Sequence, residues 1–253
     1  MGAVTASRLI DGRGTSEHAW QRWLQRNPLK GVSSCDLVAG SGTVHIVAPH
    51  PDDEILACAG MIQQLGKSGT PITIWAVTDG EASHPETSGR SKENLAAVRT
   101  RESQRAVSLL NANIRRHRLR IRDGGVTDAE EELAATLESV FRSGDTVVAP
   151  WLLDGHPDHE AAARASWVAS RKRLCRFLEV PIWGWHWARP DNRVFPVQRA
   201  VAIALTPAER RLKCSAIYAF ESQLKPDQET GKPAVLPEYV LARFTRSYEV
   251  FFR

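Results

Sequence analysis

Short apolar runs alternate with amphipathic stretches along most of the chain. A run of a few apolar residues is typical of a buried strand, and apolar residues that recur every three or four positions are typical of a helix. The alternation of the two predicts an α/β fold with a doubly wound, mostly parallel sheet and helices on both faces. The pattern predicts strands at 44–48, 72–77, 119–121, 146–149, 180–187 and 197–205. It predicts helices over 55–65 and 91–110, and others that begin near Thr127, after His156 and near Thr206.

Two of these helices carry a start signal. Thr127 and Glu130, like Thr206 and Glu209, have the spacing of a capping box, and Pro207 suits the first position of a helix. After residue 224 the chain is rich in proline at first, and the apolar runs at 239–241 and 248–252 predict edge strands.

Residues 1–40 differ from the alternating part. A short helix is predicted from Ser16, with Trp20, Trp23 and Leu24 on one face, and Asn27-Pro28 ends it. We expect an N-terminal extension with one short helix over 1–40 and a single domain over 41–253. The extension has no function that its sequence reveals.

Charge and cysteine content narrow the classes of function. The 33 basic and 29 acidic residues leave a net charge of +4, and the basic residues are scattered apart from the run 115–122, which is typical of the charged face of a half-exposed strand. We therefore expect no nucleic-acid partner. No apolar run approaches the roughly 18 residues of a membrane span. The four cysteines are widely spaced, which predicts reduced thiols and a cytoplasmic protein.

The first chemical motif follows the strand at 44–48. A Rossmann-like nucleotide-binding fold would place a glycine-rich turn there, but this chain has His50, Asp52, Asp53 and Glu54. Imidazole and carboxylate are ligands of catalytic zinc, so the substitution favours a divalent metal over a nucleotide. The alternative is that these acids only serve the helix dipole and its caps.

A second motif, with His156 and His159, follows the strand at 146–149. In a sheet of order 3-2-1-4-5 the first and fourth strands are neighbours, so both motifs lie at their carboxyl ends. Three protein ligands with an open position for water form the pattern of a hydrolytic zinc site. A histidine pair alone would as readily be a surface feature, so the prediction depends on the two motifs together.

The two motifs, HPDDE and HPDH, resemble those of the PIG-L or LmbE-like N-deacetylases, and the resemblance covers roughly residues 44–223. It implies that His50, Asp53 and His159 hold zinc, with iron(II) as the other candidate. It further implies that Asp52 is the general base and that His156 is the general acid or the partner of the oxyanion. Glu54 is expected to support the site or to cap the helix.

Weaker motifs extend the resemblance. Glu81 ends a T-x-G-E pattern, Arg99 belongs to an R-x-x-E helix with Glu102, and Asp123 begins a D-G turn. The resemblance implies that Arg99 and Asp123 contact the sugar, with Glu81 as a further substrate-binding candidate. A structural ion pair between Arg99 and Glu102 is the alternative.

The segment around 183–187 has no counterpart in these motifs. Alternation of Trp183, Trp185 and Trp187 predicts three indoles on one strand face, with His186 opposite. We interpret them as core or subunit-interface packing, with a sugar-stacking surface as the alternative.

Together these features predict a metal-dependent hydrolase that removes an N-acetyl group from an N-acetylglucosamine-type sugar or its conjugate. The expected partner is this small molecule, and a homo-oligomer is left open. Two alternatives remain: a metal-dependent hydratase of an unsaturated dicarboxylic acid on the same scaffold, and a non-catalytic sugar-binding protein.

Overall fold

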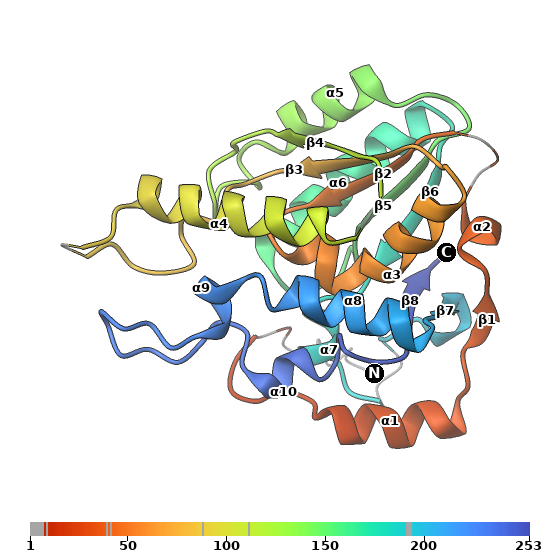
Figure 1. The fold of residues 1–253 in the computed structure, drawn as a ribbon. Helices are drawn as coiled ribbons and strands as arrows, with labels where there is room; N and C mark the ends of the chain where they lie inside the picture. Colours follow the sequence, from red (N-terminus) through yellow and green to blue (C-terminus); the bar gives the residue numbers. More distant parts are fainter. Residues whose placement is uncertain are drawn as a thin grey trace, which may run out of the picture.

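The computed structural model describes residues 8, 10–38, 40, 42–87, 89–110, 112–190 and 194–253. Within these ranges, eight strands form one sheet of order β1-β7-β8-β6-β5-β2-β3-β4 (Figure 1). All neighbouring pairs are parallel except those of β8, which runs antiparallel to β6 and β7. The strands are β1 Lys30–Val32, β2 Val44–Ala48, β3 Ile72–Ala76, β4 Ile114–Arg118, β5 Thr146–Pro150, β6 Arg176–Val180, β7 Ala200–Ala204 and β8 Tyr248–Phe252.

Helices cover both faces of the sheet (Figure 1). Ile46 of β2 belongs to a core with helices α3, α4 and α8, whereas the next residue, Val47, belongs to a core with α5 and α6. This alternation confirms the predicted doubly wound, mostly parallel α/β fold. The helices are α1 Glu17–Arg26, α2 Ser34–Leu37, α3 Asp53–Lys67, α4 Lys92–Ser108, α5 Glu130–Val140, α6 Pro157–Lys172, α7 Gly184–Trp187, α8 Pro207–Ile217, α9 Glu221–Leu224 and α10 Glu238–Leu241, with a 3-10 turn at Val197–Arg199.

Two strand predictions were displaced by local geometry. The third strand of the alternating part is 114–118 rather than 119–121, because Arg120 takes a φ of 58° and breaks the extended chain. The strand predicted at 180–187 ends at Val180, and residues 184–187 are helical. There the Asp154 carboxylate accepts hydrogen bonds from the backbone N–H groups of 182, 183 and 184, which turns the chain away from the sheet.

Other local predictions were also wrong. Thr127 does not cap α5, whose N-cap is Ala129, while Thr206 and Glu209 do form the predicted capping box of α8. Residues 239–241 form a helical turn instead of an edge strand. Tyr248–Phe252 is a strand, but it lies inside the sheet between β6 and β7, where five of its residues pair with β7.

The N-terminal segment packs closely on the rest of the chain. Ser16 caps α1 as predicted, the Trp20 indole donates to the Trp185 carbonyl oxygen, and β1 adds to β7 at the sheet edge. The boundary at residue 40 stays a prediction, and residues 1–7, 9 and 39 of the predicted extension lie outside the described residues.

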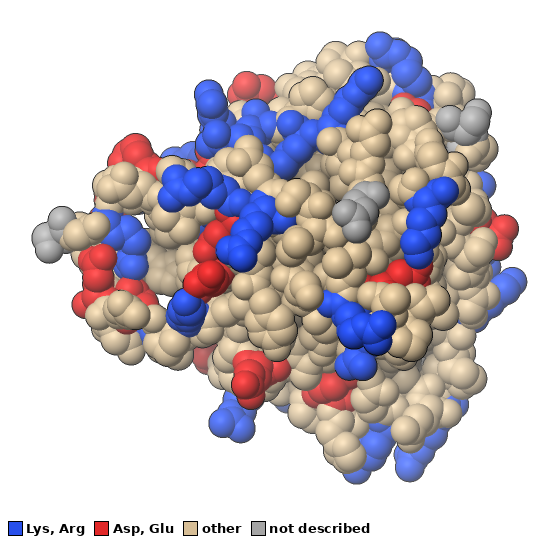
Figure 2. Space-filling view, viewed as in Figure 1, with Lys and Arg blue, Asp and Glu red and all other residues tan. Residues whose placement is uncertain are grey.

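Lys and Arg side chains are spread over the face of the molecule in Figure 2, with acidic side chains between them. This distribution agrees with the prediction that the basic residues are scattered and do not form one basic patch on this face. None of the helices in the described ranges is long and apolar enough to span a membrane.

Candidate metal centre and its cavity

Both motifs lie at the same edge of the sheet. Strands β2 and β5 are parallel neighbours, with Ile46 opposite Val148, so the turns after them leave the sheet side by side. Helix α3 begins at Asp53 directly after the first turn, and α6 begins after His156, its N-cap residue. Residues about 100 positions apart thus meet because two adjacent strands end together.

Three ligand atoms form a compact triangle at this edge. His50 Nδ1 lies 3.1 Å from His159 Nε2 and 3.5 Å from Asp53 Oδ2, and His159 Nε2 lies 3.3 Å from Asp53 Oδ2. Bonds of 2.0–2.1 Å to a tetrahedral metal would separate such atoms by about 3.3 Å. The three side chains predicted as ligands therefore have the spacing and the donor types that a zinc-like divalent ion requires.

Three carboxylates, two of them fully buried, contact the far nitrogens of both imidazoles. Asp154 Oδ2 lies 2.8 Å from His159 Nδ1, and Asp123 Oδ1 and Asp158 Oδ2 lie 3.2 and 3.4 Å from His50 Nε2. A carboxylate on the far nitrogen fixes the tautomer of a metal-binding histidine and aims the other nitrogen at the metal. His50, Asp123 and Asp158 also lie close enough to form a ligand group of their own. Asp123 and Asp158 already accept hydrogen bonds from backbone N–H groups. We therefore interpret them as residues that orient His50 and not as metal ligands.

The charges around the triangle favour a cation. Burial lowers the pKa of His159, but the charge of Asp53 and the hydrogen bond to Asp154 outweigh it and raise that pKa to about 9. The pKa of His50 is likewise raised well above its usual value, by Asp123, Asp158 and Asp53 against the effect of burial. The pKa of Asp53 is held far below its usual range by the two imidazoles despite its burial. Protons therefore occupy positions that a metal would take.

Asp52 stands beside the triangle in a strained backbone conformation. Its φ is 143°, a region that residues with a side chain rarely adopt, and its N–H donates to Glu54 Oε2. Burial raises the pKa of Asp52 to about 7, although the nearby Arg99 guanidinium opposes the shift. Such a carboxyl group can both accept and release a proton near neutral pH.

His156 is neutral in this setting. Burial, together with the neighbouring His159 and His50, lowers the pKa of His156 to about 3. Its Nδ1 accepts the backbone N–H of Asp158 at 3.2 Å, so in the neutral ring the hydrogen is on Nε2. The side chain can therefore donate a hydrogen bond from Nε2.

A cavity of about 160 Å³ opens beside these groups. One side is polar and includes two of the triangle residues. The other side is apolar and comes mainly from the segments 182–183 and 235–244. The polar lining consists of His50, Asp52, Asp53, Ser83, Arg99, Asp123, His156 and Gln223, and the apolar lining of Leu56, Ala82, Ile182, Trp183, Val235, Leu236, Val240 and Phe244.

Residues 45–170 match the model of the PIG-L family, which is described as GlcNAc-PI de-N-acetylase. This span contains both motifs and all three residues of the triangle. The chain carries a PIG-L family domain.

Individual relatives point the same way. The chain is 27% identical over 135 residues to the 2'-N-acetylparomamine deacetylase of Streptomyces fradiae, covering 47% of this chain and 48% of that protein. It is 30% identical over 135 residues to the probable N-acetyl-alpha-D-glucosaminyl L-malate deacetylase 2 of Bacillus anthracis, covering 48% and 56%. The chain thus spans about half the length of these curated relatives.

Among solved structures, a conserved protein from Thermus thermophilus superposes with a TM-score of 0.59 at 23% identity, covering 83% of this chain and 93% of that one. At this identity the likeness extends to the fold alone. It reaches well beyond the span of the PIG-L match.

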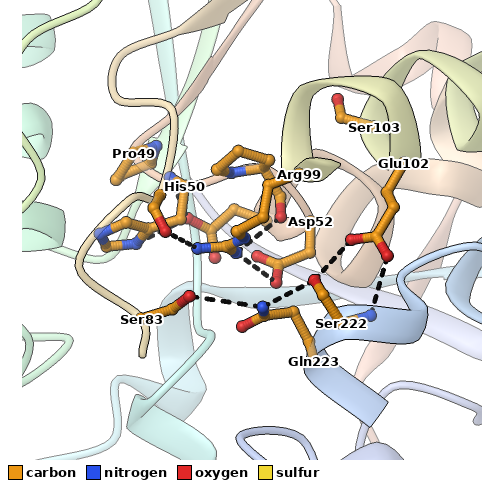
Figure 3. A network of polar contacts seen from close by, with 12 residues as sticks. Pro49, His50, Asp52, Ser83, Arg99, Glu102, Ser103, Ser222 and Gln223 are labelled. Carbon is orange, nitrogen blue, oxygen red and sulfur yellow. Dashed lines mark hydrogen bonds and ion pairs between the residues drawn. The ribbon is translucent and has the colours of Figure 1, made fainter. Parts of the chain in front are cut away.

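In this PIG-L domain the Arg99 guanidinium forms its hydrogen bonds with other groups of the protein (Figure 3). Its guanidinium donates to the carbonyl oxygens of Gly80 and Pro51 at 2.9 Å each, and to Asp52 Oδ2 at 3.0 Å. Glu102 turns instead to Ser222, from which it accepts both the N–H and the hydroxyl group. The alternative ion pair between Arg99 and Glu102 is therefore wrong, and the arginine orients Asp52.

The other predicted substrate residues differ in position. Asp123 lines the cavity, although both its oxygens have protein partners, His50 and the backbone N–H of Ala82. Glu81 is absent from the described lining and accepts the backbone N–H of Asp123, so it supports Asp123 from outside.

Sequence reasoning singled out neither Asp154 nor Asp158. Asp158 stands inside the HPDH motif, which was a signal that could have found it. The role of Asp154 depends on its contacts with His159 and with residues 182–184, and a lone aspartate in a turn gives no sign of them.

Proposed function

We propose that the protein is a zinc-dependent hydrolase that removes the N-acetyl group from an N-acetylglucosamine-type sugar or its conjugate, with iron(II) as the other candidate metal. The observation that carries the proposal is the triangle of His50 Nδ1, Asp53 Oδ2 and His159 Nε2, with sides of 3.1–3.5 Å, beside a buried carboxyl group and a cavity. The names of two relatives, both deacetylases of N-acetylated sugars, support it.

The metal would polarise the amide carbonyl group and lower the pKa of a bound water towards 7. His50, Asp53 and His159 would hold it, and Asp154 would keep His159 in the tautomer that leaves Nε2 free. His50 and Asp53 line the cavity, so a substrate bound there would lie beside these ligands.

Asp52 acts as the general base in this proposal. Its carboxylate accepts the proton of the attacking water, and its raised pKa, about 7, makes this transfer favourable near neutral pH. Arg99 fixes the carboxylate through the contact of 3.0 Å. A bound cation would lower the pKa of Asp52 somewhat and keep it ionised before attack.

His156 stabilises the carbonyl oxygen of the substrate in this proposal. Its neutral ring donates a hydrogen bond from Nε2 to the oxygen that gains negative charge, and the proton that Asp52 has taken from the water passes to the departing amine. Arg99, Asp123 and Glu81 are proposed as substrate-binding residues in this reaction, Arg99 through its position in the cavity lining and Glu81 through Asp123.

The free state of all four cysteines favours a reducing compartment, and we propose the cytoplasm.

The decisive experiment compares Asp52→Asn with Glu54→Gln. Asp52 lines the cavity, whereas Glu54 is a neighbouring buried carboxyl group outside the lining that accepts the Asp52 N–H and the Ser103 hydroxyl group. A glutamine can keep the first contact through its oxygen and donate to the Ser103 oxygen from its NH₂ group. We expect Asp52→Asn to lower kcat for acetate release by about 100-fold or more with metal still bound, the loss expected of a general base. Glu54→Gln should retain most of the activity.

The same assay separates the other functions. Purified protein should contain near-stoichiometric zinc or iron and release acetate from N-acetylglucosamine conjugates. Addition of water to an unsaturated dicarboxylic acid without acetate release would replace the deacetylase with a hydratase. A saccharide that binds tightly and is recovered unchanged from the metal-loaded protein would indicate a binding protein.

A further inference from the structure

The apolar wall of the cavity comes mostly from outside the span that matches the family model. Val235, Leu236, Val240 and Phe244 lie in and beside α10, beyond residue 170, and Trp183 lies just before α7. The metal-binding and catalytic motifs of the sequence lie outside these segments. The wall is therefore a feature of this chain that the family match does not explain.

The wall is preformed. The N–H of Leu236 donates to the carbonyl oxygen of Gln223 at 2.9 Å, which ties the wall to a residue of the polar lining. Gln223 in turn contacts Ser83 across the cavity margin and Ser222 beside it (Figure 3). A surface that is already fixed costs little ordering when an apolar group binds to it.

Over the residues that the structure describes, the apolar wall offers no charged partner to an anionic group. Arg99 is the one Lys or Arg in the described lining, and its charge is compensated by Asp52. The carboxyl groups of Asp53 and Asp123 belong to the polar side of the lining, where the imidazoles and the proposed metal balance them. A carboxylate on the part of the substrate that packs on this wall would lose its hydration without gaining a cationic partner.

We propose that the substrate carries an uncharged, apolar aglycone next to its N-acetylated amino sugar, and that this aglycone packs on the wall formed by Trp183, Val235, Leu236, Val240 and Phe244. The inference rests on the proposed function, since it names the substrate class of the same site. It separates this chain from the Bacillus anthracis relative, whose name specifies a conjugate of L-malate, a dicarboxylate.

Three probes of matched structure test the proposal: N-acetylglucosamine, its phenyl glycoside and its 4-carboxyphenyl glycoside. We expect kcat/KM for acetate release to be at least about tenfold higher for the phenyl glycoside than for the other two. Isothermal titration calorimetry of the same three compounds with the Asp52→Asn variant gives their relative affinities without turnover.

A charge placed on the wall should invert the preference. Val235 is half-buried on the cavity, so Val235→Lys can fold with its ammonium group at the rim. The ratio of kcat/KM for phenyl over 4-carboxyphenyl glycoside should fall at least about tenfold in this variant. Val168→Lys makes the same exchange on the exposed face of α6, where Val168 is 36% exposed, and should leave the ratio unchanged.

Each result decides a different question. Equal rates and affinities for the three probes, or a preference for the carboxylate, would overturn the apolar aglycone while leaving the deacetylase in place. Tighter binding of the phenyl glycoside without acetate release from any probe would support the wall and overturn the proposed function. An unchanged ratio in Val235→Lys would place the phenyl group elsewhere and refute the assignment.

Discussion

Asp154→Asn tests whether a buried carboxylate controls the proposed metal ligand His159. Asp154 accepts four hydrogen bonds: Oδ1 from the N–H groups of Ile182 and Gly184, and Oδ2 from Trp183 N–H and His159 Nδ1, at 2.8–2.9 Å. An asparagine oxygen can replace Oδ1. Its NH₂ group would then stand at Oδ2, where it faces the Trp183 N–H and can only donate.

The His159 imidazole can accommodate the NH₂ group introduced by Asp154→Asn only by accepting a hydrogen bond from it. If the new asparagine donates to His159 Nδ1, the ring hydrogen moves to Nε2, the atom that lies 3.1 Å from His50 Nδ1 in the triangle. A protonated Nε2 cannot bind a metal. Loss of such a supporting contact costs about 10–100-fold in metal affinity, or about 1.4–2.8 kcal/mol. The unpaired Trp183 N–H should lower the free energy of unfolding by about 1–3 kcal/mol as well.

The chain supplies a matched control. Asp145 is also buried, accepts the backbone N–H groups of Thr43 and Arg142, and binds His45 Nε2 at 3.1 Å, away from the cavity. Asp145→Asn should lower the free energy of unfolding by a similar amount in urea denaturation. It should leave the zinc affinity, measured by competition with a chelator, within about twofold of the parent.

The comparison can refute the reasoning. If Asp154→Asn loses stability as Asp145→Asn does but binds zinc as tightly as the parent, Asp154 only anchors the turn at 182–184. Equal losses of zinc affinity in both variants would mean that stability, rather than the tautomer of His159, sets the affinity.

Three further predictions concern protons, packing and charge. Because the pKa of His159 is about 9 without metal, metal affinity should rise as pH increases towards 9, with proton release that calorimetry in two buffers detects; pH-independent affinity would contradict this. Gly80 has a φ of 70°, and a Cβ there would lie 2.0 Å from an Arg99 nitrogen. Gly80→Ala should therefore displace Arg99 and lower kcat by about 100-fold with metal retained, and unchanged kcat would show that Arg99 does not position Asp52. Glu249→Gln should lower the free energy of unfolding by about 3–5 kcal/mol in urea, because it removes the negative charge that balances the buried Lys213 ammonium 2.7 Å away; a loss below about 1 kcal/mol would contradict the role of this pair.

Much of the site was predictable from local sequence. The proposed ligand residues occur in two short motifs, and each motif follows a strand that the apolar pattern identifies. Adjacent parallel strands then bring the motifs together, so the sheet order suffices to place them. The contacts of Asp154 and the hydrogen bonds of the Arg99 guanidinium to the protein were not predictable from the sequence. Their partners are remote in sequence and bind through backbone atoms.

The errors in the fold have the same origin. The alternation of Trp183, Trp185 and Trp187 is a valid strand pattern, yet hydrogen bonds to Asp154 fold this segment into α7 and send the indoles in different directions. Trp183 lines the cavity, Trp185 packs edge-on against Trp20 and Trp187 stacks on Trp151. The alternation of apolar residues reports which side chains of a single element are buried. It does not report hydrogen bonds from a remote residue that favour another backbone conformation.

The sequence by itself determined the α/β class, the neighbouring strands β2 and β5, and the identity of the residues at their ends. These features follow from short-range periodicity and from the fixed geometry of parallel strands. Only the tertiary structure decided the distances of 3.1–3.5 Å within the triangle, the protonation of its members and the apolar wall from 235–244. Distances and pKa values depend on burial and on charges from several elements at once, which no single stretch of sequence contains.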